Sequence, residues 1–119
     1  MKSATGSHTG TGTWLVQRAT AVLLALALPG LSLYFLAVRP FDFVSWQALF
    51  APALLRVLIL LCGVALALHA WVGMRDIFMD YVHSTGARLA LYLTVIAILA
   101  GSVAWLAVIV FGATRWSTA

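Results

Sequence analysis

The chain has 119 residues, of which 64% are hydrophobic and only 8% are charged. Soluble domains carry about a quarter of their residues as charged side chains, so this composition excludes an ordinary soluble protein. The net charge of +4 does not indicate nucleic-acid binding, because the basic residues stand singly at the ends of apolar segments. Basic side chains at such positions usually reach toward the membrane surface.

Three segments lack Asp, Glu, Lys and Arg, and each is long enough to cross a bilayer: residues 19–38, 57–74 and 89–114. They leave too few residues for a separate soluble domain. The sequence therefore predicts an all-α membrane protein with three transmembrane helices. A single cysteine, Cys62, excludes an internal disulfide, and we expect it to be a packing residue.

The domain organisation follows from the position of these segments. Residues 1–13 are rich in Gly, Ser and Thr, and we expect them to form a mobile polar tail. Residues 14–119 then form a single three-helix transmembrane domain, with spans at about 16–38, 53–80 and 88–113. The first apolar run exceeds the usual length in a signal peptide and no small-residue cleavage site closes it, so we expect this helix to be retained.

The first helix is predicted to begin near Trp14, and Pro29-Gly30 near its middle should kink it or open its backbone. The connection over residues 39–52 carries four aromatic side chains and suits a segment at the membrane surface. The second helix should run from about Pro52 to about Tyr81, and a short loop at residues 83–86 should lead into the third.

Basic residues indicate the orientation. With three spans, the N-terminal tail and the second loop share one side of the membrane, which carries Lys2, Arg18, Arg75 and Arg88. The opposite side carries three basic residues, so the count slightly favours a cytoplasmic N-terminus.

The second span contains His69, its only ionisable side chain apart from the thiol of Cys62. A polar ring at this depth is costly unless something satisfies it, so it marks a candidate functional site. Composition and spacing leave two interpretations open. His69 either hydrogen-bonds to a neighbouring helix within a packing seam, or ligates a haem iron, which imidazole does well.

The helix face around His69 changes character along its length. At 100° per residue, the face shared with His69 includes small residues within the span and acidic residues beyond it: Cys62, Ala65, Gly73, Asp76 and Asp80. Small residues admit the close approach of another helix or of a flat ligand such as a porphyrin edge. Gly73, one turn from His69, would leave space for such a macrocycle.

The acidic end of this face also has two interpretations. Asp76 and Asp80 could belong to a solvated helix end with Arg75 and Arg88 as partners. Alternatively, a pocket at the membrane edge could use Tyr81 to donate a hydrogen bond to a carbonyl, with Asp80 orienting it or supplying protons. We expect His83 to be a solvated loop residue, although a proton-handling role at the rim of this pocket is the alternative.

These residues also carry a family resemblance. The run His69-Ala-Trp-Val-Gly-Met74, followed by Asp80-Tyr81-Val82, resembles the small haem-binding membrane anchor of succinate dehydrogenase. The stretch Val16-Gln-Arg-Ala-Thr-Ala21 is similar to that family too, and the likeness extends over roughly residues 14–110. The charged pair Arg75-Asp76 and the proline-free loop at residues 83–86 depart from the family pattern near the second, acidic part of the face.

The resemblance implies specific roles. Two anchor subunits of this family each contribute one histidine to a b-type haem, so His69 would be one axial ligand and the second membrane anchor subunit would supply the other. Arg18 would lie near the haem propionates. Tyr81 would hydrogen-bond the ubiquinone carbonyl, with Asp80 beside it.

The resemblance implies a non-catalytic anchor of succinate:quinone oxidoreductase in the cell inner membrane, with a cytoplasmic N-terminus. Flavoprotein and iron–sulfur subunits would oxidise succinate, since this sequence has no Gly-rich dinucleotide loop and no cysteine set for clusters. Two alternatives remain: a small transporter or channel subunit with a proton relay through His69 and Asp76, or a haem-free structural anchor.

Overall fold

A computed structural model of the chain describes residues 8–39 and 42–112, which form helices and contain no strand. The helices are α1 (His8–Val38), α2 (Phe43–Leu49), α3 (Ala53–Tyr81) and α4 (Thr85–Gly112). Three of them, α1, α3 and α4, are long and apolar enough to cross a membrane. The prediction of an all-α membrane protein with three spans is therefore confirmed.

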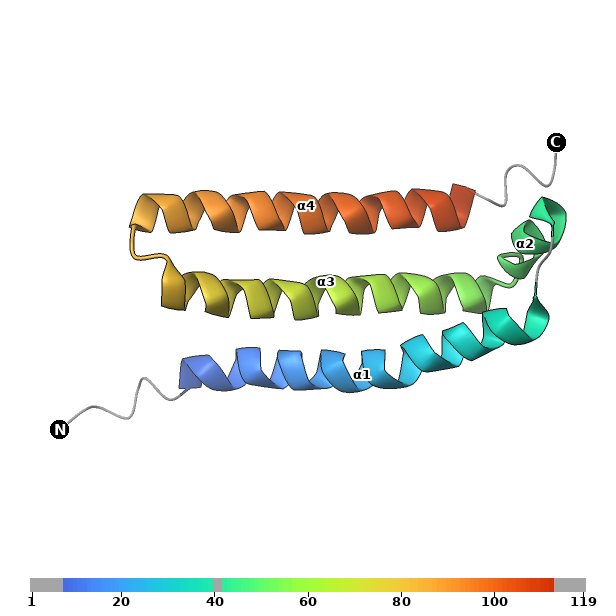
Figure 1. Ribbon diagram of the computed structural model, residues 1–119, viewed down its shortest axis with the longest axis horizontal. Helices are drawn as coiled ribbons and strands as arrows, with labels where there is room; N and C mark the ends of the chain where they lie inside the picture. The colour runs from blue at the N-terminus through green and yellow to red at the C-terminus, as the bar shows by residue number, and fades with distance from the viewer. Residues whose placement is uncertain (1–7, 40–41, 113–119) are drawn as a thin grey trace.

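The three long helices lie side by side in one layer, with α3 in the middle (Figure 1). α1 and α4 each pack along α3, but within the described residues they do not contact each other. The turn between α3 and α4 lies at the same end of the layer as the start of α1, while α2 lies at the other end (Figure 1). Tyr81, the last residue of α3, is therefore on the same side as the beginning of α1.

Two helix boundaries differ from those predicted. α1 begins at His8 rather than near Trp14, so residues 8–13 are helical, and the rest of the predicted mobile tail lies outside the described residues. α4 begins at Thr85, three residues before the predicted span. The apolar run indicates only which part of a helix lies in lipid. Once a helix has formed, each further residue adds a hydrogen bond at little cost, so the helix can extend beyond that run.

Pro29 lies inside α1, which remains helical on both sides of it. The C-terminal part of α1 nevertheless takes a different direction from its N-terminal part (Figure 1). Proline has no N–H to donate, and its ring displaces the carbonyl of the preceding turn, which accounts for such a bend. The helix ends where Arg39 adopts a left-handed conformation with φ of 46°.

The connection between α1 and α3 contains the short helix α2. The carboxylate of Asp42 caps it by accepting a hydrogen bond of 3.0 Å from the Ser45 N–H. Hydrogen bonding to Ser45, through the side chain first and the backbone second, lowers the pKa of Asp42. The rings of Phe35, Trp46 and Phe50 pack together with centroids 5.4–6.2 Å apart. α2 is thus held to the end of α1 by aromatic contacts.

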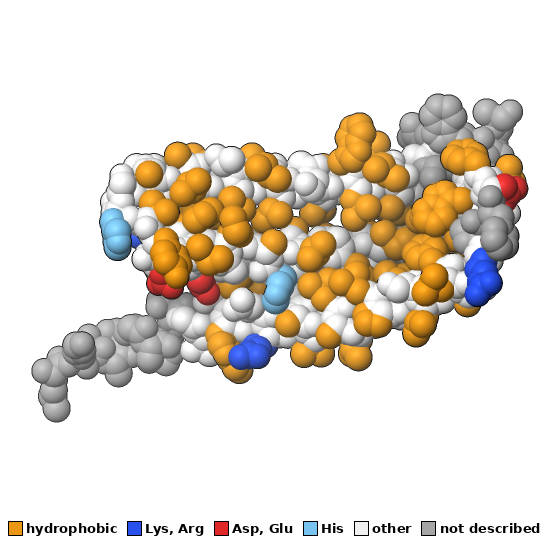
Figure 2. Space-filling model, in the orientation of Figure 1, with side chains coloured by type: hydrophobic (Ala, Val, Ile, Leu, Met, Phe, Trp, Pro, Cys, Tyr) orange, Lys and Arg blue, Asp and Glu red, His pale blue; other side chains and the backbone are white. Residues whose placement is uncertain are grey.

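A single layer of helices buries few side chains. The buried apolar residues of the described chain are Leu24, Leu49, Cys62, Ala65, Val72 and Val110. Large apolar side chains such as Leu26 are exposed, in that case to 75%. Orange apolar side chains accordingly cover much of the face shown in Figure 2. An apolar surface of this extent requires lipid or another protein against it.

α3 and α4 approach each other closely at Gly63. A Cβ atom placed on this residue would overlap the side chain of Leu106. Small residues at helix interfaces let the backbones approach each other in lipid, where dispersion contacts drive association. The side chain of Leu106 on α4 therefore occupies the space that a side chain at Gly63 would need.

Substitution Gly63→Leu should destabilise the α3–α4 pair, because overpacking of a close contact costs about 1–3 kcal/mol. We expect a lower thermal midpoint for the detergent-solubilised protein. Gly101→Leu is the matched control, since a Cβ at Gly101 meets nothing within 4 Å. The double variant Gly63→Leu/Leu106→Ala should recover part of the loss. Equal midpoints for Gly63→Leu and the wild type would contradict this account of the interface.

Candidate functional site

His69 is joined to α1 by a hydrogen bond across the α1–α3 interface. Its Nδ1 atom lies 3.2 Å from the hydroxyl oxygen of Thr20. Thr20 is only 8% exposed, whereas His69 is half-buried. The partner that an imidazole within a membrane span requires is therefore supplied, on one side of the ring, by the neighbouring helix.

Buried residues along one side of α1 and one side of α3 face each other and bring Thr20 and His69 together. On α3, buried Cys62, Ala65 and Val72 follow the same helical spacing as His69, so all four lie along one side. On α1, Thr20 and Leu24 are buried one turn apart. The small residues predicted near His69 thus form a packing seam, and Cys62 is a buried free cysteine as expected.

The other side of the His69 ring is open. The contact to Thr20 uses Nδ1, and Nε2 makes no hydrogen bond to any other described residue. One turn further along α3, a Cβ placed on Gly73 would have nothing within 4 Å. The His69 side chain is half-buried, so part of its ring is exposed. The free ring nitrogen and the space at Gly73 are compatible with a flat ligand bound against this face.

Arg18 precedes Thr20 by two residues on α1 and is exposed. Its guanidinium carbon lies 5.7 Å from the centroid of the Trp14 ring, a cation–π arrangement at the start of the span. No carboxylate of the described residues forms an ion pair with it. Its N–H donors therefore remain available for an external carboxylate, which guanidinium binds in a two-pronged geometry.

The acidic end of α3 is separate from His69. Asp76, Asp80 and Tyr81 are all exposed, Tyr81 to 79%. Tyr81 lies twelve residues beyond His69, which corresponds to about 18 Å along the helix axis. The hydroxyl of Tyr81 makes no hydrogen bond to any described residue. Within the described residues no ion pair joins Asp76 or Asp80 to Arg75 or Arg88. Of the two interpretations, the first therefore holds only as a solvated helix end without ion pairs.

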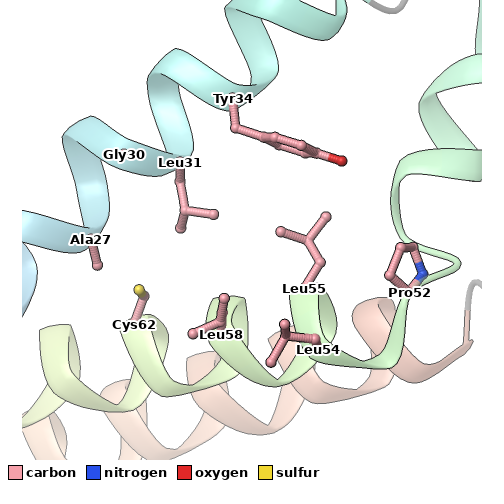
Figure 3. Close-up of a pocket in the computed structure, with 9 residues that line it drawn as sticks. All are labelled: Ala27, Gly30, Leu31, Tyr34, Pro52, Leu54, Leu55, Leu58 and Cys62. Atoms are coloured by element: carbon pink, nitrogen blue, oxygen red, sulfur yellow. The ribbon is translucent and has the colours of Figure 1, made fainter.

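A cavity of 460 Å³ opens between α1 and α3 at a different level (Figure 3). It lies toward α2, and its walls are largely apolar: Ala27, Gly30, Leu31, Tyr34, Pro52, Leu54, Leu55, Leu58 and Cys62. Of the predicted site residues, none lines this cavity. The candidate site is instead an open face of the helix layer.

Sequence reasoning gave no role to Thr20, although it lies within the stretch at residues 16–21 that resembles the anchor family. A hydroxyl inside an apolar run is a weak signal, because threonine commonly bonds to its own helix. Its significance comes from the pairing with His69, 49 residues away. The described residues contain no cluster of three or more His, Cys, Asp or Glu side chains that could hold a metal ion. The site can therefore offer a metal one imidazole.

Comparison with known proteins identifies the family. The family model described as succinate dehydrogenase/fumarate reductase transmembrane subunit matches residues 2–111. The chain is 34% identical over 99 residues to the succinate dehydrogenase hydrophobic membrane anchor subunit of Coxiella burnetii, covering 83% of this chain and 86% of that protein. With three apolar helices and agreement over most of its length, this chain belongs to the succinate dehydrogenase/fumarate reductase transmembrane subunit family.

Proposed function

We propose that this chain, a membrane anchor subunit of succinate dehydrogenase, holds one axial ligand of a b-type haem and part of a ubiquinone-reduction site. One observation carries the haem assignment. His69 has one ring nitrogen satisfied by Thr20, while Nε2 is free on an open face of the layer. A half-exposed imidazole with a free nitrogen inside a span suits metal ligation better than packing alone.

The surrounding residues fit a haem. Gly73 leaves open space one turn from His69, where the edge of a macrocycle would lie. Arg18 is exposed on the neighbouring helix and can pair with a propionate carboxylate. His69 lies six residues before Arg75, about 9 Å along the axis from that end of the span, so propionates would reach the membrane surface.

A second membrane anchor subunit would complete the site. This chain offers one imidazole, and a b-type haem with two axial histidines needs another from outside. The exposed apolar surface of the single helix layer gives such a partner a face to pack against. The layer would then become part of a larger helix bundle with the haem between the two anchors.

The ubiquinone assignment rests on Tyr81 and Asp80 at the end of α3. The phenolic hydroxyl has no partner among the described residues and can donate a hydrogen bond to a quinone carbonyl oxygen. The adjacent Asp80 carboxyl group can orient the phenol or pass a proton to the reduced quinone. At about 18 Å along the axis from His69, a quinone bound to Tyr81 would lie near the membrane surface, next to water-soluble subunits.

The proposed reaction is electron transfer, and this chain performs no bond chemistry on succinate. A flavoprotein subunit would oxidise succinate to fumarate, and an iron–sulfur subunit would carry the two electrons to ubiquinone. Ubiquinone would take up two protons with them, from the side of the membrane where Tyr81 lies. A bound haem would supply an additional electron-accepting centre. The slight excess of basic residues on the Tyr81 side supports a cytoplasmic N-terminus in the inner membrane.

A haem-free structural anchor is the second candidate, and the Thr20 hydrogen bond favours it. A histidine that bonds a neighbouring helix within a seam of small residues meets the structural requirement without a cofactor. The transporter alternative gains no comparable support, since no hydrogen bond joins His69 to Asp76.

Replacement His69→Gln separates these two candidates. Loss of the iron ligand should abolish the low-spin b-type signal in a reduced-minus-oxidised optical spectrum of the purified complex. His83→Gln changes a loop histidine and should leave that spectrum unchanged. A b-type signal that persists in His69→Gln would remove His69 as the iron ligand. A wild-type complex that lacks this signal, with succinate-driven quinone reduction intact, would favour the haem-free anchor.

Replacement Gly73→Leu tests the space beside His69. A leucine side chain would occupy the open region, so haem content per flavin should fall by at least half. Gly101→Leu, at an equally open glycine of α4, should retain full haem content. Unchanged haem content in Gly73→Leu would show that the macrocycle does not lie against this turn.

Replacement Tyr81→Phe removes the proposed quinone hydrogen bond, which is worth about 1 kcal/mol, so succinate-driven ubiquinone reduction should slow roughly fivefold. The haem spectrum and the reduction of a water-soluble artificial acceptor should not change. Tyr34→Phe, near the opposite end of the layer, is the control. Equal ubiquinone reduction rates in Tyr81→Phe and the wild type would remove Tyr81 from the quinone site.

A further inference from the structure

Thr20 is the only buried polar residue among the described residues. Its hydroxyl oxygen has three neighbours within hydrogen-bond distance: the Val16 carbonyl oxygen at 2.7 Å, the Gln17 carbonyl oxygen at 3.1 Å and His69 Nδ1 at 3.2 Å. A hydroxyl has a single proton to donate and lone pairs with which to accept. The three contacts therefore cannot all be donations by Thr20.

The two carbonyl oxygens decide where the hydroxyl proton goes. A carbonyl oxygen can only accept, and the Val16 oxygen is the nearest of the three neighbours. With the proton directed to the carbonyls of its own helix, the Thr20 oxygen meets His69 with a lone pair. The contact at 3.2 Å is then a donation from the Nδ1–H of His69 to the Thr20 oxygen.

We propose that Thr20 is the positioning residue for His69, accepting the Nδ1–H and holding the imidazole in the tautomer whose Nε2 carries the free lone pair. The haem consequence of this role rests on the proposed function. The opposite tautomer would present an N–H on the open face and could not ligate iron. Thr20 thus selects the form of His69 that is competent to bind metal.

The hydrogen bond has a consequence for the electronic character of the ligand. An imidazole that donates its Nδ1–H is a stronger electron donor through Nε2, and its ring orientation is restrained. A stronger donor stabilises ferric over ferrous iron, so loss of the acceptor should raise the haem midpoint potential. The loss of such an outer hydrogen bond typically weakens metal binding by roughly 10–100-fold.

The test uses the complete complex with two variants at this position and one matched control. Thr20→Val keeps the shape of the side chain but removes the acceptor, whereas Thr20→Ser retains a hydroxyl. Thr94→Val removes a threonine hydroxyl that bonds the Ala90 carbonyl at 2.8 Å on α4 and does not contact His69. Redox titration gives the haem potential, and electron paramagnetic resonance reports the low-spin ferric ligand field.

We expect Thr20→Val to raise the midpoint potential and shift the ferric resonance, while Thr20→Ser and Thr94→Val stay close to the wild type. Wild-type behaviour of Thr20→Val in both measurements would overturn the positioning role, although the haem assignment itself would stand. Loss of the haem signal in His69→Gln verifies that assignment separately.

A measurement that needs no haem tests the proton directly. Nitrogen-15 spectra of the complex labelled at histidine identify which ring nitrogen of His69 carries the proton. His69→Gln assigns the resonance. A protonated Nδ1 in the wild type that changes in Thr20→Val supports the proposal even in a complex that holds no haem. A protonated Nε2 in the wild type overturns it.

Discussion

The hydrogen bond between Thr20 and His69 is the interaction on which the candidate site depends. Inside a bilayer no water is available to solvate an imidazole, so the ring needs a partner from the protein. The bond fixes the register of α1 against α3, since only one alignment places Thr20 opposite His69 while Leu24 also packs into the seam. Nδ1 of the ring is hydrogen-bonded within the seam. The contact that holds the two helices together therefore leaves Nε2 without a hydrogen-bond partner among the described residues.

The arrangement in a single layer explains why the chain has candidate groups but no enclosed site. α3 contacts both other long helices, and within the described residues the outer two do not meet. Each face of such a layer is open, and the groups proposed for haem and quinone lie on surfaces rather than in a cavity. The 460 Å³ cavity between α1 and α3 has nearly apolar walls and lies away from these groups. The chain therefore presents open faces to lipid or protein, as suits one subunit of a multi-subunit oxidoreductase.

Hydropathy and residue type were sufficient to predict the three spans, and the cost of burying an imidazole singled out His69. The same reasoning could not find Thr20, because a helical repeat shows which residues share a face but not which face of another helix lies opposite. The start of α1 at His8 was missed since the apolar run ends well inside the helix.

Opposite charges near one another in sequence suggested ion pairs for Asp76 and Asp80, yet the described residues form none. Long side chains at an exposed helix end gain little from pairing. The quinone and propionate contacts involve groups outside this chain, so the sequence of this chain alone does not define them.

The hydrogen bonds from the Thr20 hydroxyl to carbonyl oxygens of its own helix have a consequence for assembly in the membrane. During synthesis α1 enters the membrane before α3 exists, and its buried hydroxyl already donates to carbonyl groups of its own helix. The Thr20 hydroxyl of α1 is therefore hydrogen-bonded in lipid even before α3 packs against it. His69 arrives later and finds an acceptor held in place. Because α1 is synthesised before α3, the acceptor on Thr20 is already in place when His69 packs against it.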